Sequence, residues 1–287
     1  MSLFVQQILN GLTLGSVYSL VALGLTLVYG ILHIPNFSHG ALFMAGAYAA
    51  FFVAGSLGAN YWVALVAAAI VTALIAVLSE RLVFNRLRDA PPLHDMIAAI
   101  GLLLFFEAVA QAIWGADFHR LAPPYPGILR VAGTVLPIQR VLIIVAALAL
   151  MLGLHFFLKR TVMGTTIVAM AQNREGASLV GIDLTRVSML TFAISGALAA
   201  IAAVLFAPIN LVFPGMGNLV ILKAFVIIIL GGMGSVPGAI IGGMVIGFAE
   251  SFGAFYISTD MKDIIAFALL VVILSVRPEG LFPASAR

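Results

Sequence analysis

The chain has 287 residues, of which 63% are hydrophobic and only 9% are charged, and its formal net charge is +3. Soluble domains are about 45–50% apolar and about 25% charged, so this chain lacks the charged side chains that cover a water-facing surface. The composition, with a mean hydropathy of +1.20, excludes a soluble enzyme and predicts an integral membrane protein.

Nine apolar segments follow one another along the chain and predict an all-α polytopic membrane protein. Several approach the roughly 20 residues that cross a bilayer core. They lie at residues 8–30, 37–56, 60–79, 96–114, 138–158, 187–208, 219–234, 238–256 and 263–276. The whole chain, 1–287, is therefore expected to be one transmembrane domain of eight or nine helices, some of them discontinuous.

The two counts differ in how the stretch 33–40 (HIPNFSHG) is interpreted. It separates the first two segments without a single Asp, Glu, Lys or Arg, and Pro35 favours a helix break. If the break is a loop outside the bilayer, nine spans result and the N-terminus lies outside. If it lies within the membrane, eight spans result and the N-terminus lies inside.

Basic residues gather in two loops and in the C-terminal tail. They are Arg81, Arg86 and Arg88 in the first loop, Lys159, Arg160, Arg174 and Arg186 in the second, and Arg277 and Arg287 in the tail. Two segments separate the two loops, so both lie on one side, which the positive-inside rule makes cytoplasmic. This distribution favours membrane topology rather than nucleic-acid binding as the reason for the positive charge.

Sequence patterns typical of enzymes are absent. No lysine follows a glycine, so there is no G-x-x-x-x-G-K-[ST] loop for ATP. The five histidines lack the spacing of a zinc site, the chain has no cysteine, and no G-x-S-x-G nucleophile elbow occurs. We therefore predict no catalytic residue, no metal and no cofactor.

Ionisable side chains inside apolar segments are candidates for a solute pathway, because each is costly in a membrane unless it is paired or hydrated. They are Glu107, with Gln111 four residues later, Lys223 and Glu250. The alternative is structural: Lys223 reaches the outer interface and the glutamates form bonds between helices. An ion pair between Lys223 and Glu250 is compatible with the sequence, which fixes no distance.

Two glycine- and proline-containing stretches, HIPNFSHG and LGGMGSVPG, interrupt the apolar pattern. Non-helical backbone at membrane depth survives only against protein or a water-filled cavity, so Asn36, Ser38 and His39 are further pathway candidates. An ordinary tight turn is the alternative. Pairs such as Gly11/Gly15 and Gly243/Gly247 form G-x-x-x-G patterns that allow close helix packing, within the chain or in a dimer.

The second basic loop, about residues 160–186, predicts a short amphipathic helix near 165–179. Gly164 and Gly181 flank it, Met170, Ala171 and Ala177 supply small or apolar surface, and Asn173, Arg174 and Glu175 supply polar contacts. Such a helix can dock into a partner subunit or lie at the membrane surface for topology alone. The residues by themselves do not separate these alternatives.

Three blocks carry a resemblance to a known family: TLVYGILHIPNFSHGALFMAGAY, GTTIVAMAQNREGASLVGIDLTRV and LGGMGSVPGAIIGG. In this order and spacing the chain resembles the LivH-type permease subunits of branched-chain amino acid ABC importers, over about residues 9–282. The resemblance implies a bacterial inner-membrane subunit that forms half of a translocation pathway by alternating access. Permeases of this kind also serve urea, short amides and other amino acids. The competing class is a standalone channel or secondary carrier.

The resemblance also implies partners. They are a LivM-type second permease, two ATPases of the LivG and LivF type that bind the ATP, and a periplasmic substrate-binding protein. The block 163–181 would be the coupling segment that an ATPase grips. Its candidate residues are Gly164, Ala171, Asn173, Arg174, Glu175, Ala177 and Gly181.

Overall fold

The computed structural model describes residues 2–33, 35–88, 90–131 and 134–282, and it is almost entirely helical. The α-helices are α1 (Ser2–Leu32), α2 (Ser38–Phe51), α3 (Tyr61–Ser79), α4 (Asn85–Leu87), α5 (Pro92–Trp114), α6 (Ile138–Arg160), α7 (Val162–Gln172), α8 (Arg174–Leu179), α9 (Leu184–Phe206), α10 (Met216–Gly231), α11 (Val236–Tyr256) and α12 (Lys262–Val276). The π-helical turns η1 (Phe52–Ser56) and η2 (Glu80–Phe84) extend α2 and α3, and the 3-10 turn η3 (Thr259–Met261) precedes α12.

Strands occur only in the outer loop of the described chain. There β1 (Ile128–Val131) and β2 (Thr134–Pro137) pair antiparallel, with Leu129 opposite Leu136. This hairpin was not predicted. It leads directly into α6, so it extends the end of one membrane helix and leaves the all-α prediction for the membrane region intact.

Among the described residues, seven helical stretches are long and apolar enough to cross a membrane. They are Leu3–Ile31, Ser38–Ser56, Tyr61–Leu87, Pro92–Trp114, Ile138–Arg160, Leu184–Phe206 and Val236–Tyr256. The apolar helices α10, with 16 residues, and α12, with 15, are shorter. Within the described residues these match the nine predicted segments, and α1 and α2 form separate spans on either side of the break at Pro35.

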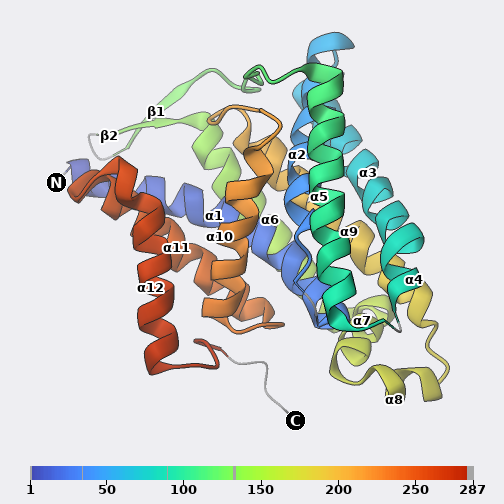
Figure 1. Cartoon of the computed structure of the whole chain (residues 1–287). Coiled ribbons are helices and arrows are strands. Elements are labelled where there is room, and N and C mark those ends of the chain that lie inside the picture. The colour runs from blue at the N-terminus through green and yellow to red at the C-terminus, as the bar shows by residue number, and fades with distance from the viewer. Residues whose placement is uncertain (1, 34, 89, 132–133, 283–287) are drawn as a thin grey trace.

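The loops sort to two ends of the bundle (Figure 1). The helices α4, α7 and α8 lie at the lower end of that view, whereas the hairpin lies at the opposite end. The two basic loops thus share a side, as predicted, and we call this the cytoplasmic end. Helix α12 ends on the same side, and Arg277 directly follows it; Arg287 lies outside the described residues.

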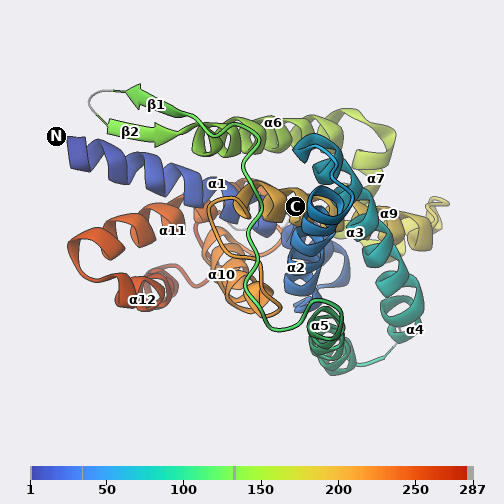
Figure 2. The ribbon, with the colours of Figure 1, turned by 90° about the horizontal axis from the view of Figure 1, so that it is seen from above.

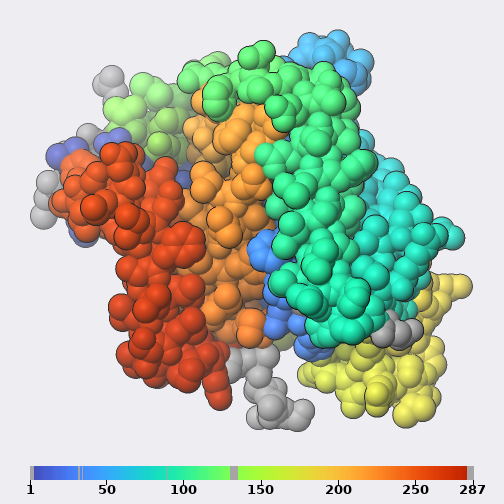
Figure 3. Space-filling view, in the orientation of Figure 1, coloured from blue at the N-terminus to red at the C-terminus, as the bar shows by residue number. Residues whose placement is uncertain are grey.

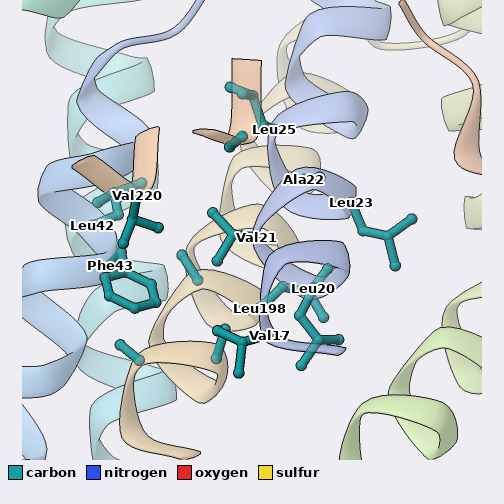
Figure 4. Close-up of a cluster of buried hydrophobic side chains, with 14 of the residues drawn as sticks. Val17, Leu20, Val21, Ala22, Leu23, Leu25, Leu42, Phe43, Leu198 and Val220 are labelled. Atoms are coloured by element: carbon teal, nitrogen blue, oxygen red, sulfur yellow. The ribbon is translucent and has the colours of Figure 1, made fainter. Parts of the chain in front are cut away.

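Helix α1 forms the centre of the molecule, and α5 lies at its edge. In the most apolar window of α1, 83% of the residues are buried, against 11% in that of α5. Seen from above, α1 runs between α6 and α11 (Figure 2). Figure 4 shows Val17 and Val21 of α1 in one cluster with Phe43 of α2 and Leu198 of α9.

Glycines bring α1 and α11 into backbone contact. A Cβ on Gly247 would lie 2.2 Å from the backbone nitrogen of Gly15, and a Cβ on Gly243 would lie 2.3 Å from Ser19 Oγ. Because only hydrogen fits at these positions, the two helices approach more closely than any larger residue would permit. The predicted G-x-x-x-G faces therefore pack within one chain.

Candidate functional site

An outer cavity of about 540 Å³ opens at the end of the bundle opposite the basic loops, between α1, α10 and α11. Gln7, Asn10 and Thr13 of α1 line it at spacings that place them on one side of the helix. Apolar side chains from the α9–α10 region, among them Phe206 and Phe213, form another part of its wall. The cavity thus combines a polar strip with an apolar wall.

A charged cluster lies in the lining of the outer cavity. Lys223 Nζ of α10 lies 2.8 Å from Glu250 Oε1 of α11 and 2.9 Å from Asp263 Oδ1 of α12. The Tyr18 hydroxyl of α1 donates to Glu250 Oε2 at 2.8 Å and accepts from Lys223 at 3.1 Å. One ammonium group therefore joins side chains from four helices.

The sequence allowed a pair between Lys223 and Glu250 without fixing a distance, and the structure forms it at 2.8 Å. Lys223 is only 8% exposed, so it does not extend to the outer interface. Sequence reasoning missed Tyr18, which lies 205 residues from Lys223, and Asp263. The sequence could have indicated them only as a tyrosine inside the apolar first span and an aspartate at the start of the last apolar segment.

Arg140 and Asn10 present unused polar atoms around the same cavity. Both residues line it. Arg140 Nε and Asn10 Oδ1 are buried and have no hydrogen-bond partner among the described residues, and no carboxylate of the described chain forms an ion pair with Arg140. One donor and one acceptor in the wall of this cavity are thus left unsatisfied.

The other ionisable candidate, Glu107, lies apart from this cluster. Its half-buried carboxylate accepts from Asn218 Nδ2 of α10 at 3.2 and 3.4 Å. This contact joins α5 to α10, which lie side by side on the face in Figure 3. Gln111 is exposed, so the structure does not bring these two residues together in one pocket. A transport role for either remains a prediction.

An inner cavity of about 520 Å³ lies at the cytoplasmic end. Tyr29 and Gly30 of α1, Ala171 and Gln172 of α7, and the turn between α10 and α11 line it. The two stretches predicted as breaks and the predicted coupling segment therefore meet around one space. Sequence separation alone gave no indication of this meeting.

The first break is held by internal hydrogen bonds. Asn36 Oδ1 accepts from the backbone nitrogen of Ser38 at 3.1 Å and from its hydroxyl at 2.6 Å, which fixes the start of α2. His39 is fully buried; its Nε2 donates to the Val21 carbonyl at 3.0 Å, and its Nδ1 lies 3.2 Å from Ser195 Oγ. These contacts join α2 to α1 and α9, and a pathway role for Asn36, Ser38 and His39 remains a prediction.

The second break, LGGMGSVPG, is a tight turn. Gly232 and Gly234 have φ of 101° and 80°, which favour glycine. Ser235 then accepts from the Gly238 nitrogen and caps α11. The structure thus has the ordinary tight turn that was the alternative to a pathway break in this stretch, and the turn also lines the inner cavity.

The predicted single helix at 165–179 is wrong in one respect: the structure has two helices, α7 and α8. The break falls at Asn173, whose side chain accepts from Gly176 N at 2.8 Å and caps α8. Because Asn forms such caps readily, it ends one helix and starts the next. Gly164 lies inside α7 against the Phe157 carbonyl, and Gly181, with φ of 85°, follows α8.

The predicted coupling segment, residues 160–186, which we call the coupling segment below, divides into buried and exposed positions. Ala177 packs inward, whereas Glu175 is exposed. Arg174 lies within electrostatic range of Asp95 at the start of α5. Sequence reasoning missed the exposed apolar side chains of this segment, which are Val162, Met163, Val168, Leu179 and Val180.

Comparisons with known proteins agree on one family. A family described as the permease component of the branched-chain amino acid transport system matches residues 7–274. The chain is 38% identical to the high-affinity branched-chain amino acid transport system permease protein LivH of Escherichia coli, over 97% of this chain and 95% of that protein. It is 36% identical to BraD of Pseudomonas aeruginosa over the same shares, and 27% identical to a probable LivH of Methanocaldococcus jannaschii over 91% and 87%. No solved structure matches the chain.

Proposed function

Because this chain belongs to the permease family of branched-chain amino acid transport systems, we propose that it is the membrane-crossing subunit of an ATP-driven importer. Its cargo would be branched-chain or related hydrophobic amino acids. Relatives named for this transport match it over nearly their whole length. ATP would be bound by partner ATPases, since the chain has no P-loop.

The observation that carries the proposal is a pair of cavities on opposite sides of a closed layer. Tyr18 lines the outer cavity and Thr26 the inner one, so the two are separated by roughly 12 Å along α1. Between them Leu20, Val21 and Leu23 have no exposed surface. Alternating access requires such a layer, which parts toward one side at a time.

The outer cavity has the chemistry for a hydrophobic amino acid. Arg140 lines the cavity and forms no ion pair within the described chain, so its guanidinium would bind the carboxylate, and the Asn10 carbonyl would accept from the ammonium group. The apolar wall, including Phe206 and Phe213, suits an aliphatic side chain. Lys223 and Glu250 already neutralise each other, so in this state they contribute a polar surface rather than a free charge.

The coupling segment is the proposed handle for an ATPase subunit. Val162 and Leu179 are 84% and 87% exposed, and exposed apolar residues at the cytoplasmic end are suited to a protein partner. Movement of α7 would reach the pathway directly, because Ala171 and Gln172 line the inner cavity. A second permease and a periplasmic binding protein complete the proposed assembly.

Transport in proteoliposomes tests this proposal. The chain is reconstituted with its cognate second permease and ATPases, and uptake of radiolabelled leucine is measured with and without the loaded binding protein. We expect uptake that requires both ATP and the binding protein, and that is lost when the ATPases carry a P-loop Lys→Ala substitution. Uptake without ATP would indicate a channel or secondary carrier, and a preference for urea or short amides would overturn the proposed cargo.

A further inference from the structure

A buried carboxylate lies where the third span changes its helical geometry. Glu80 is 1% exposed. It begins the π-helical turn η2, which joins α3 to α4. Single π-helical turns inside α-helices are rare and frequently occur at functional sites. Burial of an unpaired carboxylate is costly, so Glu80 needs a partner that offsets the loss of its hydration.

That partner, Arg88, also contacts the first turn of α9, where the coupling segment ends. Arg88 Nη2 lies 3.4 Å from Glu80 Oε1, and Arg88 Nη1 donates to Thr185 Oγ1 at 3.0 Å. Thr185 is in the first turn of α9, where Asp183 caps the helix by accepting from the nitrogens of Thr185 and Arg186. One guanidinium therefore bridges the end of the third span and the end of the coupling segment.

The contact between Arg88 and Glu80 is longer than a strong charge-assisted hydrogen bond. Charge-assisted N–H···O bonds are usually about 2.7–2.9 Å long, whereas the contact between Arg88 and Glu80 is 3.4 Å. Glu80 Oε2 forms no hydrogen bond of good geometry among the described residues, and its other polar neighbour is the buried Ser188 of α9. A small displacement of α9 relative to α3 can therefore shorten or break the link and change its energy substantially.

The two bridged helices are in direct contact along their length. A Cβ on Gly196 of α9 would lie 2.7 Å from Ala76 Cβ and 2.9 Å from the Thr72 carbonyl of α3. Near the bridge, the rings of Phe84 and Phe192 have centroids 5.3 Å apart. Because no void separates the two helices at these positions, a displacement of the start of α9 also displaces α3.

We propose that Glu80, Arg88 and Thr185 form a positioning link that transmits displacement of the coupling segment to the third span. The link acts through the segment and touches no substrate. Its role rests on the proposed function, because a coupling segment without an ATPase has no displacement to transmit. The residues lie outside the block 163–181 that the family resemblance identified.

The test compares the ratio of leucine imported to ATP hydrolysed in the reconstituted complex. Arg88→Gln removes the charge, Arg88→Lys retains it, and Thr185→Val removes only the hydroxyl contact. Arg86→Gln is the matched control, because Arg86 is an exposed arginine of the short helix α4 that Arg88 directly follows. We expect Arg88→Gln to lower the ratio about tenfold, Arg88→Lys to restore part of it, and Arg86→Gln to leave it unchanged.

Assembly and melting temperature of each complex are measured alongside. An unchanged ratio in assembled Arg88→Gln and Thr185→Val complexes would overturn the link. If Arg88→Gln fails to assemble, Thr185→Val decides, because it leaves the ion pair with Glu80 in place. An Arg174→Ala/Glu175→Ala variant separates the two proposals. If it uncouples transport from ATP hydrolysis while the Arg88 variants do not, only the proposed link is contradicted. If none of these variants uncouples transport, the proposed role of the coupling segment is contradicted as well.

Discussion

At the scale of single residues, the cluster around Lys223 shows how a charge can be held inside this protein. Lys223 contacts Glu250, Asp263 and the Tyr18 hydroxyl, each at 3.1 Å or less. Removal of a buried charge from water is offset only when partners and hydrogen bonds are all in place. The cluster therefore depends on every member, and loss of one leaves the others uncompensated.

We expect Lys223→Met to destabilise the protein more than the double variant Lys223→Met/Glu250→Gln. The single variant leaves the Glu250 carboxylate buried without its cation, at a cost of about 3–5 kcal/mol. The double variant removes both buried charges, and Asp263, whose side chain is 37% exposed, loses its cation in both variants alike. Thermal unfolding followed by size-exclusion chromatography in detergent measures the difference, and equal melting temperatures for the two variants would contradict this account.

At the scale of elements, contact between helices depends on residues without side chains. The α1–α11 contact is built on Gly15 and Gly247, and the α3–α9 contact on Gly196. Within a membrane, helices do not gain from removing apolar surface from water, so close packing supplies much of their attraction. Glycine is required at these positions because a Cβ would overlap atoms of the facing helix.

We expect Gly247→Ala to reduce the yield of folded protein and the free energy of unfolding by about 1–3 kcal/mol, because its methyl group would overlap the α1 backbone. Gly153→Ala on α6 is the control, since a Cβ there meets nothing within 4 Å. The same chromatographic melting assay reports both. Equal stability of the two variants would show that α1 and α11 separate without cost.

The coupling segment gives a second prediction at this scale. We expect Arg174→Ala/Glu175→Ala to lower binding-protein-stimulated uptake while basal ATP hydrolysis and membrane insertion persist, because these side chains belong to α8 on the cytoplasmic end. Arg81→Ala, an exposed position at the same end outside the segment, serves as the control. Normal uptake and normal stimulation of ATP hydrolysis in the double variant would exclude the role.

At the scale of the whole molecule, the fold places two cavities at opposite ends with packed helices between them. The outer cavity gathers residues from α1, α6, α10 and α11, and the inner one from α1, α6, α7 and the turn before α11. Helices α1 and α6 contribute to both, and α1 is the more deeply buried of the two. A tilt of α1 relative to its neighbours would therefore change both openings together, as alternating access requires.

We expect Arg140→Gln to raise the apparent KM for leucine uptake about tenfold, because a charge-assisted bond to the carboxylate is worth about 1.5–3 kcal/mol. Uptake at saturating substrate should change less. Arg120→Gln, an exposed arginine of the outer loop that does not line the cavity, should leave KM unchanged. An unchanged KM for Arg140→Gln would remove Arg140 from the proposed pathway.

Taken by itself, the sequence determined that this protein lives in a bilayer, where its spans lie, which loops share a side and which segment faces the cytoplasm. These properties are local, because hydrophobic length and basic flanks are read one segment at a time. Only the tertiary structure decided that Tyr18 and Asp263 complete the site of Lys223, that Asn173 divides the coupling segment, and that Arg88 joins Glu80 to α9. Such contacts join residues that are distant in the chain. They depend on how the helices tilt and pack against one another, which cannot be predicted from any one segment alone.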